Sequence, residues 1–544
     1  MIKRSGFLFG FFFVVLINYL SSGSSFAAQP TPAQTRPHVL IVKFRPGVQE
    51  YNKTLTHSGV GGRRIKAFKI VEGLELVELD PGISVEEAQG LYQQDPDVLY
   101  AVPDYIVRTT ALPNDPSFGQ LWGLHNTGQA GGTPDADIDA PEAWDITTGS
   151  SSVVVAVIDT GIDYNHKDLS ANMFRNTADC NNNGLDDDGN GFIDDCFGID
   201  TFNNDSNPMD DNNHGTHVAG TIGAIGNNNV GVVGVNWNVR LMACKFLDAS
   251  GSGSTAGAIA CLEYVKMMKD RGVNIVATSN SWGGGDLSQA LLDAIDAHRQ
   301  RGILFIAAAG NGGFDGIGDD NDTAPFYPCT IYLPNVICVA ATTRTDARSS
   351  FSNFGRRTVH IGAPGSEILS TIRGSKYSTA SGTSMATPHV TGVAALLKAQ
   401  DLSRDWRSIK NLLLAGGNNI NSLTTSTITQ KRLNANGALT CSNSTVLSRL
   451  RPVGNTISAS IGTPVDLAAL HINCANPNGN VTVTVDPGGE IVPLVDDGLG
   501  SDQASGDGIY SGQWTPSAGG TFTLTFPGGD VVTVGVGAPV INVT

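Results

Sequence analysis

Basic residues are scarce in this chain of 544 residues. Lys and Arg together number 34 against 51 Asp and Glu, which gives a formal net charge of -17. Phosphate backbones are bound by clustered Lys and Arg, so this balance argues against nucleic acid as a partner. Charged residues make up only 16% and hydrophobic residues 40%, which excludes a highly charged disordered chain. The 65 glycines follow no strict period, so the chain is not collagen-like.

Long apolar runs are missing after the first residues of the chain. Lys3 and Arg4 precede the apolar run 7–20, and small residues flank Phe26. A basic start, a short apolar run and small residues are typical of a secretory signal peptide, predicted here at 1–27. The run is short for a membrane span, and an uncleaved anchor is the alternative. We therefore expect a secreted protein without a transmembrane segment.

Cysteines are few but even in number, and all eight follow the signal. An even count in an exported chain indicates disulfides, although eight cysteines allow 105 pairings. The alternative for any of them, and above all for Cys244 and Cys261, is a free cysteine that acts as a small buried hydrophobe. The simplest pairing joins neighbours along the chain: Cys180 with Cys196, Cys244 with Cys261, Cys329 with Cys338, and Cys441 with Cys474.

The rest of the chain divides by pattern into a linker and three regions. Residues 28–37 are a linker rich in Ala, Gln, Pro and Thr, and 38–108 alternate short strands with a helix, as in a small α+β unit. In 441–544 Lys and Arg almost vanish, helical periodicity stops, and alternating segments are separated by Gly- and Asp-rich turns. This pattern predicts a small antiparallel β-sandwich.

Residues 109–440 predict an α/β domain. Near-continuous apolar strands that alternate with helices indicate a mostly parallel sheet with helices on both faces. The predicted strands are 153–158, 239–246, 273–279, 303–309 and 336–341. The predicted helices are 216–225, 254–271, 288–301, 384–399 and 406–414.

Three segments of this α/β region carry candidate catalytic groups. Asp159 ends an apolar strand, His214 precedes a helix in Asn-His-Gly-Thr-His, and Ser384 opens another in Gly-Thr-Ser-Met-Ala. A serine hydroxyl is a poor nucleophile unless an imidazole removes its proton and a carboxylate orients that imidazole. Each residue alone is more simply a turn, structural or N-cap residue. Together, in this order and with these flanking residues, they favour catalysis.

The chain resembles the subtilisin-like serine proteases, the subtilases, whose order of Asp, His and Ser is the same. The resemblance implies that Asp159 orients, that His214 is the general base and acid, and that Ser384 is the nucleophile of a serine endopeptidase. It further implies that 38–108 are an inhibitor-type propeptide and 109–440 the catalytic domain. His217 and His389 match non-catalytic histidines of the same motifs.

The same resemblance extends to the oxyanion hole and the substrate strand. Asn311 follows the strand 303–309 and matches the side-chain donor of the oxyanion hole, although a turn asparagine is the simpler alternative. Ser281, Trp282 and Gly283 resemble the strand that pairs with extended substrate. Phe326 stands at the base of the S1 pocket, where some relatives have a small residue, and it either makes the pocket shallow or points away.

Ten Asp and no Lys or Arg lie in 179–211. Such a run repels itself unless cations offset its charge. Oxygen ligands at alternate positions and a turn glycine resemble the start of an EF-hand loop, but Phe197 stands where its Glu belongs. The better comparison is the Asp-rich calcium insertion of some subtilases, and a solvated acidic loop is the alternative. The predicted ligands are Asp186, Asp188, Asn190 and Asp194, with Asp210 as a further candidate.

Two further calcium sites are candidates. The first follows from the resemblance alone, with side-chain oxygens from Asp115, Asp168 and Asn228 and carbonyl oxygens from Ile225, Val230 and Val232. The second is the Asp- and Gly-rich segment 496–511, for which plain β-turns are an equal alternative.

The sequence therefore predicts a secreted, calcium-stabilised serine endopeptidase that is made as an autoprocessed precursor and acts as a monomer on protein or peptide substrates, with its own propeptide as inhibitor. A non-enzymatic relative that keeps the scaffold is the alternative, and the filled positions Asp159, His214, Asn311 and Ser384 argue against it. A lipase is disfavoured because Ser384 lacks the Gly-x-Ser-x-Gly elbow.

Overall fold

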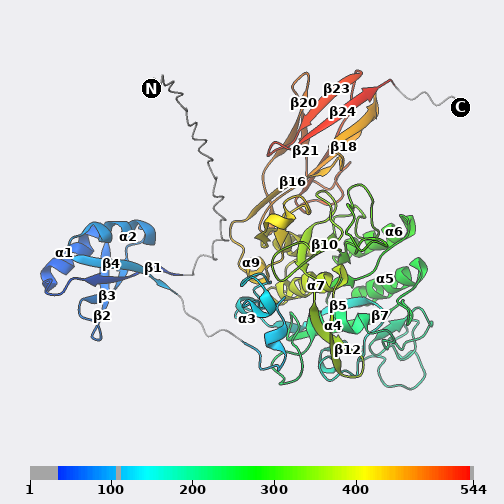
Figure 1. Ribbon diagram of the computed structural model, residues 1–544, viewed down its shortest axis with the longest axis horizontal. Coiled ribbons are helices and arrows are strands. Elements are labelled where there is room, and N and C mark those ends of the chain that lie inside the picture. Colours follow the sequence, from blue (N-terminus) through cyan, green and yellow to red (C-terminus); the bar gives the residue numbers. More distant parts are fainter. Residues whose placement is uncertain (1–34, 106–111, 539–544) are drawn as a thin grey trace, which may run out of the picture. The chain divides into compact units, whose positions relative to one another are not determined.

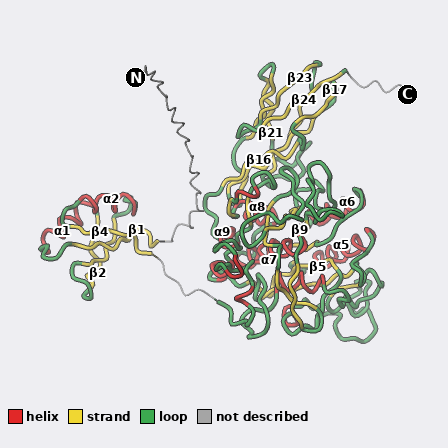
Figure 2. Tube along the Cα trace, in the orientation of Figure 1, coloured by secondary structure: helices red, strands yellow, loops and turns green. Residues whose placement is uncertain are grey.

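The computed structural model describes residues 35–105 and 112–538. The predicted signal peptide, nearly all of the linker and the segment 106–111 lie outside the described residues. The chain forms two compact units, residues 1–108 and 109–544, shown in Figure 1 and coloured by secondary structure in Figure 2. In the described residues no helix is both long and apolar enough to cross a bilayer.

The first unit has the element order β-α-β-β-α-β around a four-stranded antiparallel sheet, as the α+β prediction requires. The sheet order is β2-β3-β1-β4. Alternate residues of β1, such as Leu40 and Val42, pack with Tyr92 and Ala88 of α2 in one apolar cluster. The elements are β1 (Thr35–Phe44), α1 (Glu50–Val60), β2 (Gly62–Phe68), β3 (Leu74–Leu79), α2 (Val85–Gln94) and β4 (Val98–Tyr105).

A nine-stranded, mostly parallel sheet forms the centre of the second unit, in the order β14-β15-β11-β10-β9-β8-β5-β7-β6. Its strands are β5 (Gly149–Asp159), β6 (Gly198–Asp200), β7 (Asn238–Lys245), β8 (Ile275–Asn280), β9 (Leu304–Ala308), β10 (Val336–Thr342), β11 (Ile361–Pro364), β14 (Asn418–Asn419) and β15 (Lys431–Arg432). A separate hairpin joins β12 (Ile368–Ile372) and β13 (Lys376–Ala380). The predicted α/β architecture with helices on both faces is confirmed.

Helices cover both faces of this sheet because its strands are apolar on both sides. Val155 and Val157 of β5 belong to the cluster that includes α4 and α7, whereas Ala156 and Ile158 belong to the cluster that includes α5 and α6. The helices are α3 (Ala140–Trp144), α4 (His214–Gly223), α5 (Thr255–Asp270), α6 (Gln289–Gln300), α7 (Thr383–Gln400), α8 (Trp406–Ala415) and α9 (Ala435–Leu439).

The C-terminal region is a β-sandwich, but it is not wholly antiparallel as predicted. β17 pairs with β24 in parallel. The strand before β17 in the chain lies in the other sheet, so β17 does not form a hairpin with it. One sheet holds β16 (Thr445–Arg451), β18 (Val465–Asn473), β19 (Asn476–Pro477) and β22 (Ile509–Trp514). The other holds β17 (Thr456–Ser460), β20 (Val481–Asp486), β21 (Glu490–Leu494), β23 (Gly520–Thr525) and β24 (Val531–Gly537).

The sandwich shares its core with the catalytic region. Leu450 and Ile472 belong to the same apolar cluster as Leu413 of α8. The buried pair Lys410 and Asp507 lies 3.4 Å apart across this junction, and a second ion pair joins catalytic and sandwich residues further along it. The sandwich is therefore fixed by buried contacts and not merely tethered.

All eight cysteines pair with their nearest neighbour along the chain, as predicted. The four disulfides are Cys180–Cys196, Cys244–Cys261, Cys329–Cys338 and Cys441–Cys474. The first closes the acidic loop, and the last lies within the C-terminal region 441–544.

Candidate active site

The candidate catalytic residues meet at the carboxyl ends of neighbouring parallel strands. Asp159 is the last residue of β5, Asn280 the last of the adjacent β8, and Asn311 follows β9, which lies beside β8. His214 is the first residue of α4, and Ser384 the second of α7. Because α4 and α7 pack against each other under the sheet, residues distant in sequence converge where an α/β sheet presents its crevice.

Asp159 and His214 form a hydrogen-bonded pair. Nδ1 of His214 lies 2.8 Å from Oδ1 of Asp159, whose side chain is fully buried. Burial alone would lower the pKa of His214, but the Asp159 carboxylate and, more weakly, Asp210 outweigh it, so the pKa of His214 lies above its ordinary value of 6.5. An imidazole held in this way accepts a proton through its free Nε2.

Asp210 connects the two segments that carry this pair. Its Oδ1 accepts a hydrogen bond from the hydroxyl of Thr160, 2.9 Å away, and its Oδ2 accepts from the hydroxyl and the backbone N–H of Thr216, at 2.5 and 3.1 Å. Thr160 follows Asp159, and Thr216 lies one turn into the His214 helix. Both oxygens of Asp210 accept hydrogen bonds here, and Asp210 is not among the three carboxylates that cluster in the acidic loop; its role as a calcium ligand stays a prediction. Asp210 stands four residues before His214 in the sequence, and this proximity was the one sequence feature that pointed to a role beside the catalytic pair.

The hydroxyl of Ser384 faces the substrate strand. It donates to the carbonyl of Ser281 at 3.1 Å, and the hydroxyl of Ser281 donates back to the carbonyl of Ser384 at 2.9 Å. Among the described residues it makes no hydrogen bond to His214. Catalytic hydrogen bonds commonly tighten only when substrate binds, so this rotamer is a resting arrangement.

Thr383 orients the Asn311 amide, which sequence analysis did not anticipate. Oδ1 of Asn311 accepts from the backbone N–H and the hydroxyl of Thr383, at 2.8 and 2.9 Å. The Thr383 hydroxyl also accepts from the N–H of Gly310 at 3.1 Å. With its oxygen held, the amide leaves Nδ2 as a free donor, next to the helix that begins with Thr383 and Ser384. Two donors so placed suit an oxyanion.

The predicted substrate residues Ser281, Trp282 and Gly283 follow β8 as an extended segment. A side chain at Gly283 would come within 2.3 Å of the Phe326 ring, and one at Gly310 within 3.1 Å of it. The Phe326 ring therefore lies between the substrate segment and the oxyanion segment, and it does not point away.

A cavity of about 300 Å³, here called the strand pocket, borders the same segment. It is lined by Trp282 and Gly283 on one side and by Leu247 and the Gly- and Ser-rich loop 251–254 on the other. The Trp282 ring rests edge-on against Phe246 with ring centres 4.9 Å apart. The pocket has a mixed lining, with the apolar groups of Trp282 and Leu247 facing polar residues that include Asp286.

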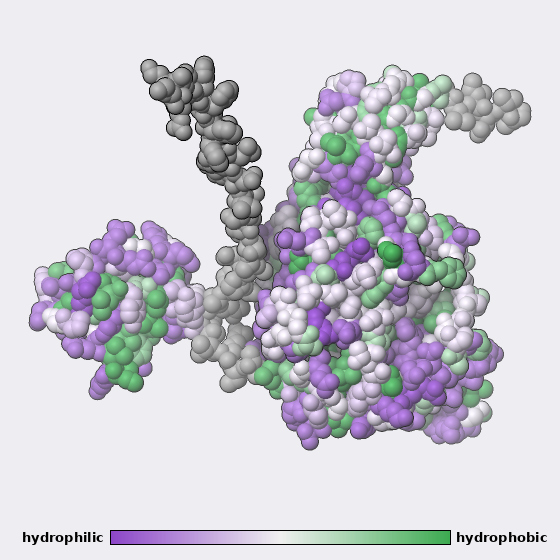
Figure 3. Space-filling model, viewed as in Figure 1, coloured by the Kyte–Doolittle hydropathy of each residue, from purple (hydrophilic) through white to green (hydrophobic). Residues whose placement is uncertain are grey.

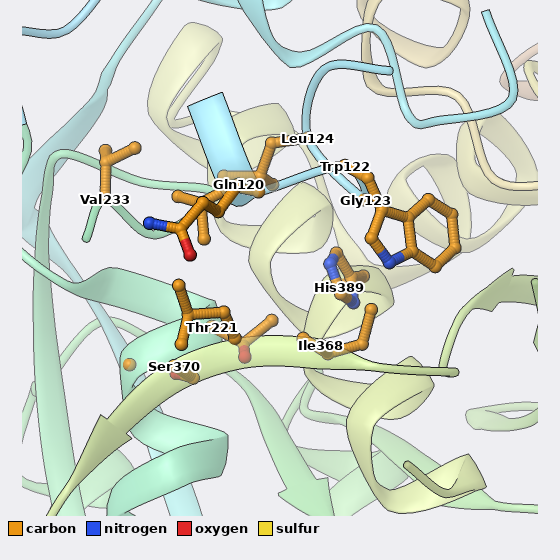
Figure 4. A pocket seen from close by; sticks show the side chains of 12 residues that line it. Gln120, Trp122, Gly123, Leu124, Thr221, Val233, Ile368, Ser370 and His389 are labelled. Atoms are coloured by element: carbon orange, nitrogen blue, oxygen red, sulfur yellow. The ribbon is translucent and has the colours of Figure 1, made fainter. Parts of the chain in front are cut away.

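The two other motif histidines are buried and structural. His217 donates from Nε2 to two backbone carbonyls at 3.0 and 3.1 Å, and Nδ1 of His389 donates to the carbonyl of Met385 at 2.9 Å. Burial lowers the pKa of each ring to about 4, so both are neutral. Figure 4 shows His389 beside Trp122 and Ile368 at a cavity of about 20 Å³, enough for a single water.

The acidic loop brings together some of its predicted ligands. Carboxylate oxygens of Asp186 and Asp188 lie within 4.8 Å of each other and of Asp179, which the sequence analysis did not name. Asn190 and Asp194 are not in this cluster; like Asp186, they take part in hydrogen bonds within the loop. Hydrophilic residues gather at the lower right of the larger unit in Figure 3, where Figure 1 places the loops beside β7.

Chemically, this cluster fits a hard cation. Asp188 is half-buried, and its Oδ1 has no hydrogen-bond partner among the described residues; the Arg271 guanidinium lies 3.4 Å away. The single positive charge of Arg271 offsets only part of the negative charge of the three carboxylates. Oxygen ligands of this kind are those that Ca²⁺ prefers.

The second set of predicted ligands also converges. Asp168 Oδ1 accepts from the side-chain amide of Asn228 at 2.8 Å, and Asp115 accepts from the backbone N–H of Asn227 at 2.7 Å. Both carboxylates are buried, and burial raises the pKa of each. Ile225, Val230 and Val232 belong to the same loop. Two desolvated carboxylates with no ion-pair partner among the described residues suit a bound cation.

Asp496, Asp502 and Asp507 form the third cluster, with ligand oxygens within 4.8 Å of one another. Burial raises the pKa of Asp502 to about 6. Asp496 accepts from the backbone N–H groups of Gly506 and Gly508, at 2.6 and 2.9 Å. Both sequence interpretations therefore hold in part: the carboxylates cluster, and they also cap turns.

Comparison with known proteins matches these regions to two families. The subtilase (peptidase S8) family model matches residues 150–435, more than half of the chain, and the fervidolysin N-terminal prodomain model matches residues 24–104.

Three relatives are similar over long stretches. A thermophilic serine proteinase of Bacillus sp. strain AK1 is 34% identical over 362 residues, which cover 66% of this chain and 78% of that protein. Thermitase of Thermoactinomyces vulgaris is 38% identical over 266 residues, 49% of this chain and 81% of its own. An extracellular protease of Xanthomonas campestris is 33% identical over 365 residues, 61% of this chain and 57% of its own. The chain therefore belongs to the subtilase family and is a subtilisin-like serine endopeptidase with an N-terminal prodomain.

Proposed function

We propose that the enzyme cleaves peptide bonds through an acyl-enzyme on Ser384, with His214 as general base and acid, Asp159 as its orienting carboxylate and Asn311 as an oxyanion donor. The observation that carries this assignment is the 2.8 Å bond between His214 Nδ1 and buried Asp159. It fixes the ring so that Nε2 is the basic nitrogen.

In the acylation step Nε2 of His214 takes the Ser384 proton as Oγ attacks the carbonyl carbon. Negative charge moves to the carbonyl oxygen, which receives hydrogen bonds from Asn311 Nδ2 and the backbone N–H of Ser384. His214 then gives the proton to the leaving amine, and water repeats the sequence to release the acid. Asp159 stabilises the imidazolium throughout.

The substrate chain on the acyl side pairs with Ser281, Trp282 and Gly283. Because the Phe326 ring lies between Gly283 and Gly310, the side chain next to the scissile bond is small. A side chain further along the acyl side enters the strand pocket.

The enzyme is exported and processes itself. Export is supported by the predicted signal peptide and by the similarity to an extracellular protease. We place the self-cleavage within 108–114, after which the end of the propeptide, including Ile106, Val107 and Arg108, leaves the cleft as a product-like peptide. Residues 106–111 of this segment lie outside the described residues. On the prodomain sheet, the face opposite the helices carries a half-buried apolar row in which Ile41 pairs with Leu76 and Val102. Such a face suits docking against the catalytic domain as an inhibitor.

Calcium stabilises the fold at the acidic loop, through Asp179, Asp186 and Asp188, and at the loop around Asp115, Asp168 and Asn228. Bound Ca²⁺ supplies positive charge that offsets the mutual repulsion of these carboxylates. It takes no part in the proposed chemistry, since neither cluster includes a catalytic residue. The Asp496 cluster is a further candidate.

The assignment is tested by steady-state kinetics on a peptide amide. Ser384→Ala should lower kcat by a factor on the order of 10⁶, the loss known for a subtilisin without its nucleophile. Asn311→Ala should lower kcat by about 10²–10³ with little change in KM. Equal activity in parent and Ser384→Ala enzyme would refute the assignment.

A further inference from the structure

A second, larger cavity lies where the sandwich meets the catalytic region, and we call it the junction cavity. Its volume is about 590 Å³. One wall is formed by Thr330, Ile331 and Tyr332 of the catalytic region, and the other by Arg451 and Ser501 with further sandwich residues. Because buried ion pairs and a common apolar cluster fix the sandwich in place, the cavity is preformed.

The junction cavity adjoins the strand pocket. Tyr327 lines both, and the segment leading into α6 separates them: Ser288 lines the strand pocket, whereas Leu287 lines the junction cavity. The Leu287 side chain is 50% exposed. A chain that leaves the strand pocket over Leu287 therefore enters the junction cavity next.

A charged group without a partner lines this cavity. The Arg451 guanidinium lies 4.3 Å from the centre of the Tyr332 ring, and Arg451 takes part in none of the ion pairs among the described residues. The Tyr332 hydroxyl is buried beside Ser511 of the same lining. The carboxylate of Asp466, also in the lining, accepts instead from Gln513 at 2.9 Å. A guanidinium stacked on a ring presents its N–H edge, which suits a carboxylate.

We propose that the junction cavity is a second binding site for long polypeptide substrates, in which Arg451 binds an acidic side chain on the acyl side of the scissile bond. This proposal rests on the function proposed above and assigns a role to the sandwich: it extends the substrate cleft beyond the strand pocket. Short substrates that end in the strand pocket do not reach it.

The test compares short and long peptides with one cleavage site. The long peptides extend the acyl side by about eight residues, since an extended chain spans ~3.3 Å per residue, and carry Glu or Lys in the added part. We expect kcat/KM of the parent enzyme to favour the Glu peptide by about tenfold, and Arg451→Glu to reverse that preference. Arg407→Glu is the matched control, because Arg407 also stacks on a ring, that of Trp406, but away from the cavity; it should keep the parental preference.

The short peptide separates the two proposals and checks folding. Loss of its cleavage by the parent would overturn the proposed function itself. Equal kcat/KM for the Glu and Lys peptides in the parent, with the short peptide cleaved normally, would overturn the second site. Ser501→Trp, which narrows the cavity from the sandwich side without touching Arg451, should reduce the Glu preference, and an unchanged preference would also count against the proposal.

Discussion

At the scale of single residues, two carboxylates act on His214. Asp159 touches the ring, whereas Asp210 acts through space and through Thr160 and Thr216. Both raise the pKa of His214, and activity requires the neutral base. Activity should therefore fall as pH drops through a pKa above 6.5.

Asp210→Asn tests the second carboxylate. Removing its charge removes an upward contribution to the pKa of His214, so the acid limb of kcat/KM should move to lower pH. A purely structural role would lower kcat without moving the limb. Asp211→Asn is the matched control, because that carboxylate is exposed and pairs with Lys245; its limb should stay in place. If the acid limb of kcat/KM lies at the same pH in Asp210→Asn and in the parent, Asp210 does not raise the pKa of His214.

We propose that Phe326 limits the size of the side chain that the enzyme accepts before the scissile bond. Replacing it with Gly opens the space between Gly283 and Gly310, so kcat/KM for substrates with a large aromatic residue before the scissile bond should rise by roughly 10–100-fold relative to small ones. The measurement is a paired series of peptides that differ only at that residue. An unchanged ratio would mean that the Phe326 ring does not limit the pocket.

At the scale of elements, we propose that the acidic loop depends on bound calcium for its stability. A metal that binds only the native state stabilises it by about 2.7 kcal/mol at a hundredfold excess over Kd. Chelation should therefore lower the Tm, and the combined change Asp186→Asn with Asp188→Asn should reduce that shift.

Melting curves with calcium and with chelator, in the inactive Ser384→Ala form, measure this effect. Asp187→Asn is the matched control, because the exposed carboxylate of Asp187 lies outside the cluster and accepts from Asn181 and Asn183 of the loop; this variant should keep the full Tm shift. Equal Tm shifts in the parent and the double variant would mean that the loop is solvated and binds no calcium.

Local patterns were sufficient for the long elements and insufficient for the short ones. The strand predicted at 153–158 is β5 and the helix predicted at 254–271 is α5, because each is long and strongly periodic. The two-residue β14 and β15 were not predicted, since pairing across the sheet and not their own pattern forms them.

In the candidate site, too, local patterns predicted only part of what the structure shows. The motifs were enough to place Asp159, His214 and Ser384 at one edge of the sheet. Thr383 and Asp179 were missed because their roles exist only once distant segments meet: Thr383 contacts Asn311, 72 positions earlier in the chain, and Asp179 joins residues from a later turn of its loop.

At the scale of the whole molecule, we propose that the prodomain is both the inhibitor and the first substrate of the enzyme. In Ser384→Ala the precursor should accumulate uncut, because the nucleophile that removes the prodomain is absent. Gel analysis of the secreted protein measures this, and adding active enzyme should restore the cut. Normal maturation of Ser384→Ala, with no other protease present, would exclude self-processing.

The central claim is that Ser384 is the nucleophile. The most direct measurement is labelling of the mature enzyme with a serine-directed phosphonylating reagent, followed by peptide mapping by mass spectrometry. The account predicts one adduct, on Ser384, formed in step with the loss of activity, and a slower reaction when Asp159 is replaced by Asn. An adduct on another serine, with activity lost in parallel, would contradict it.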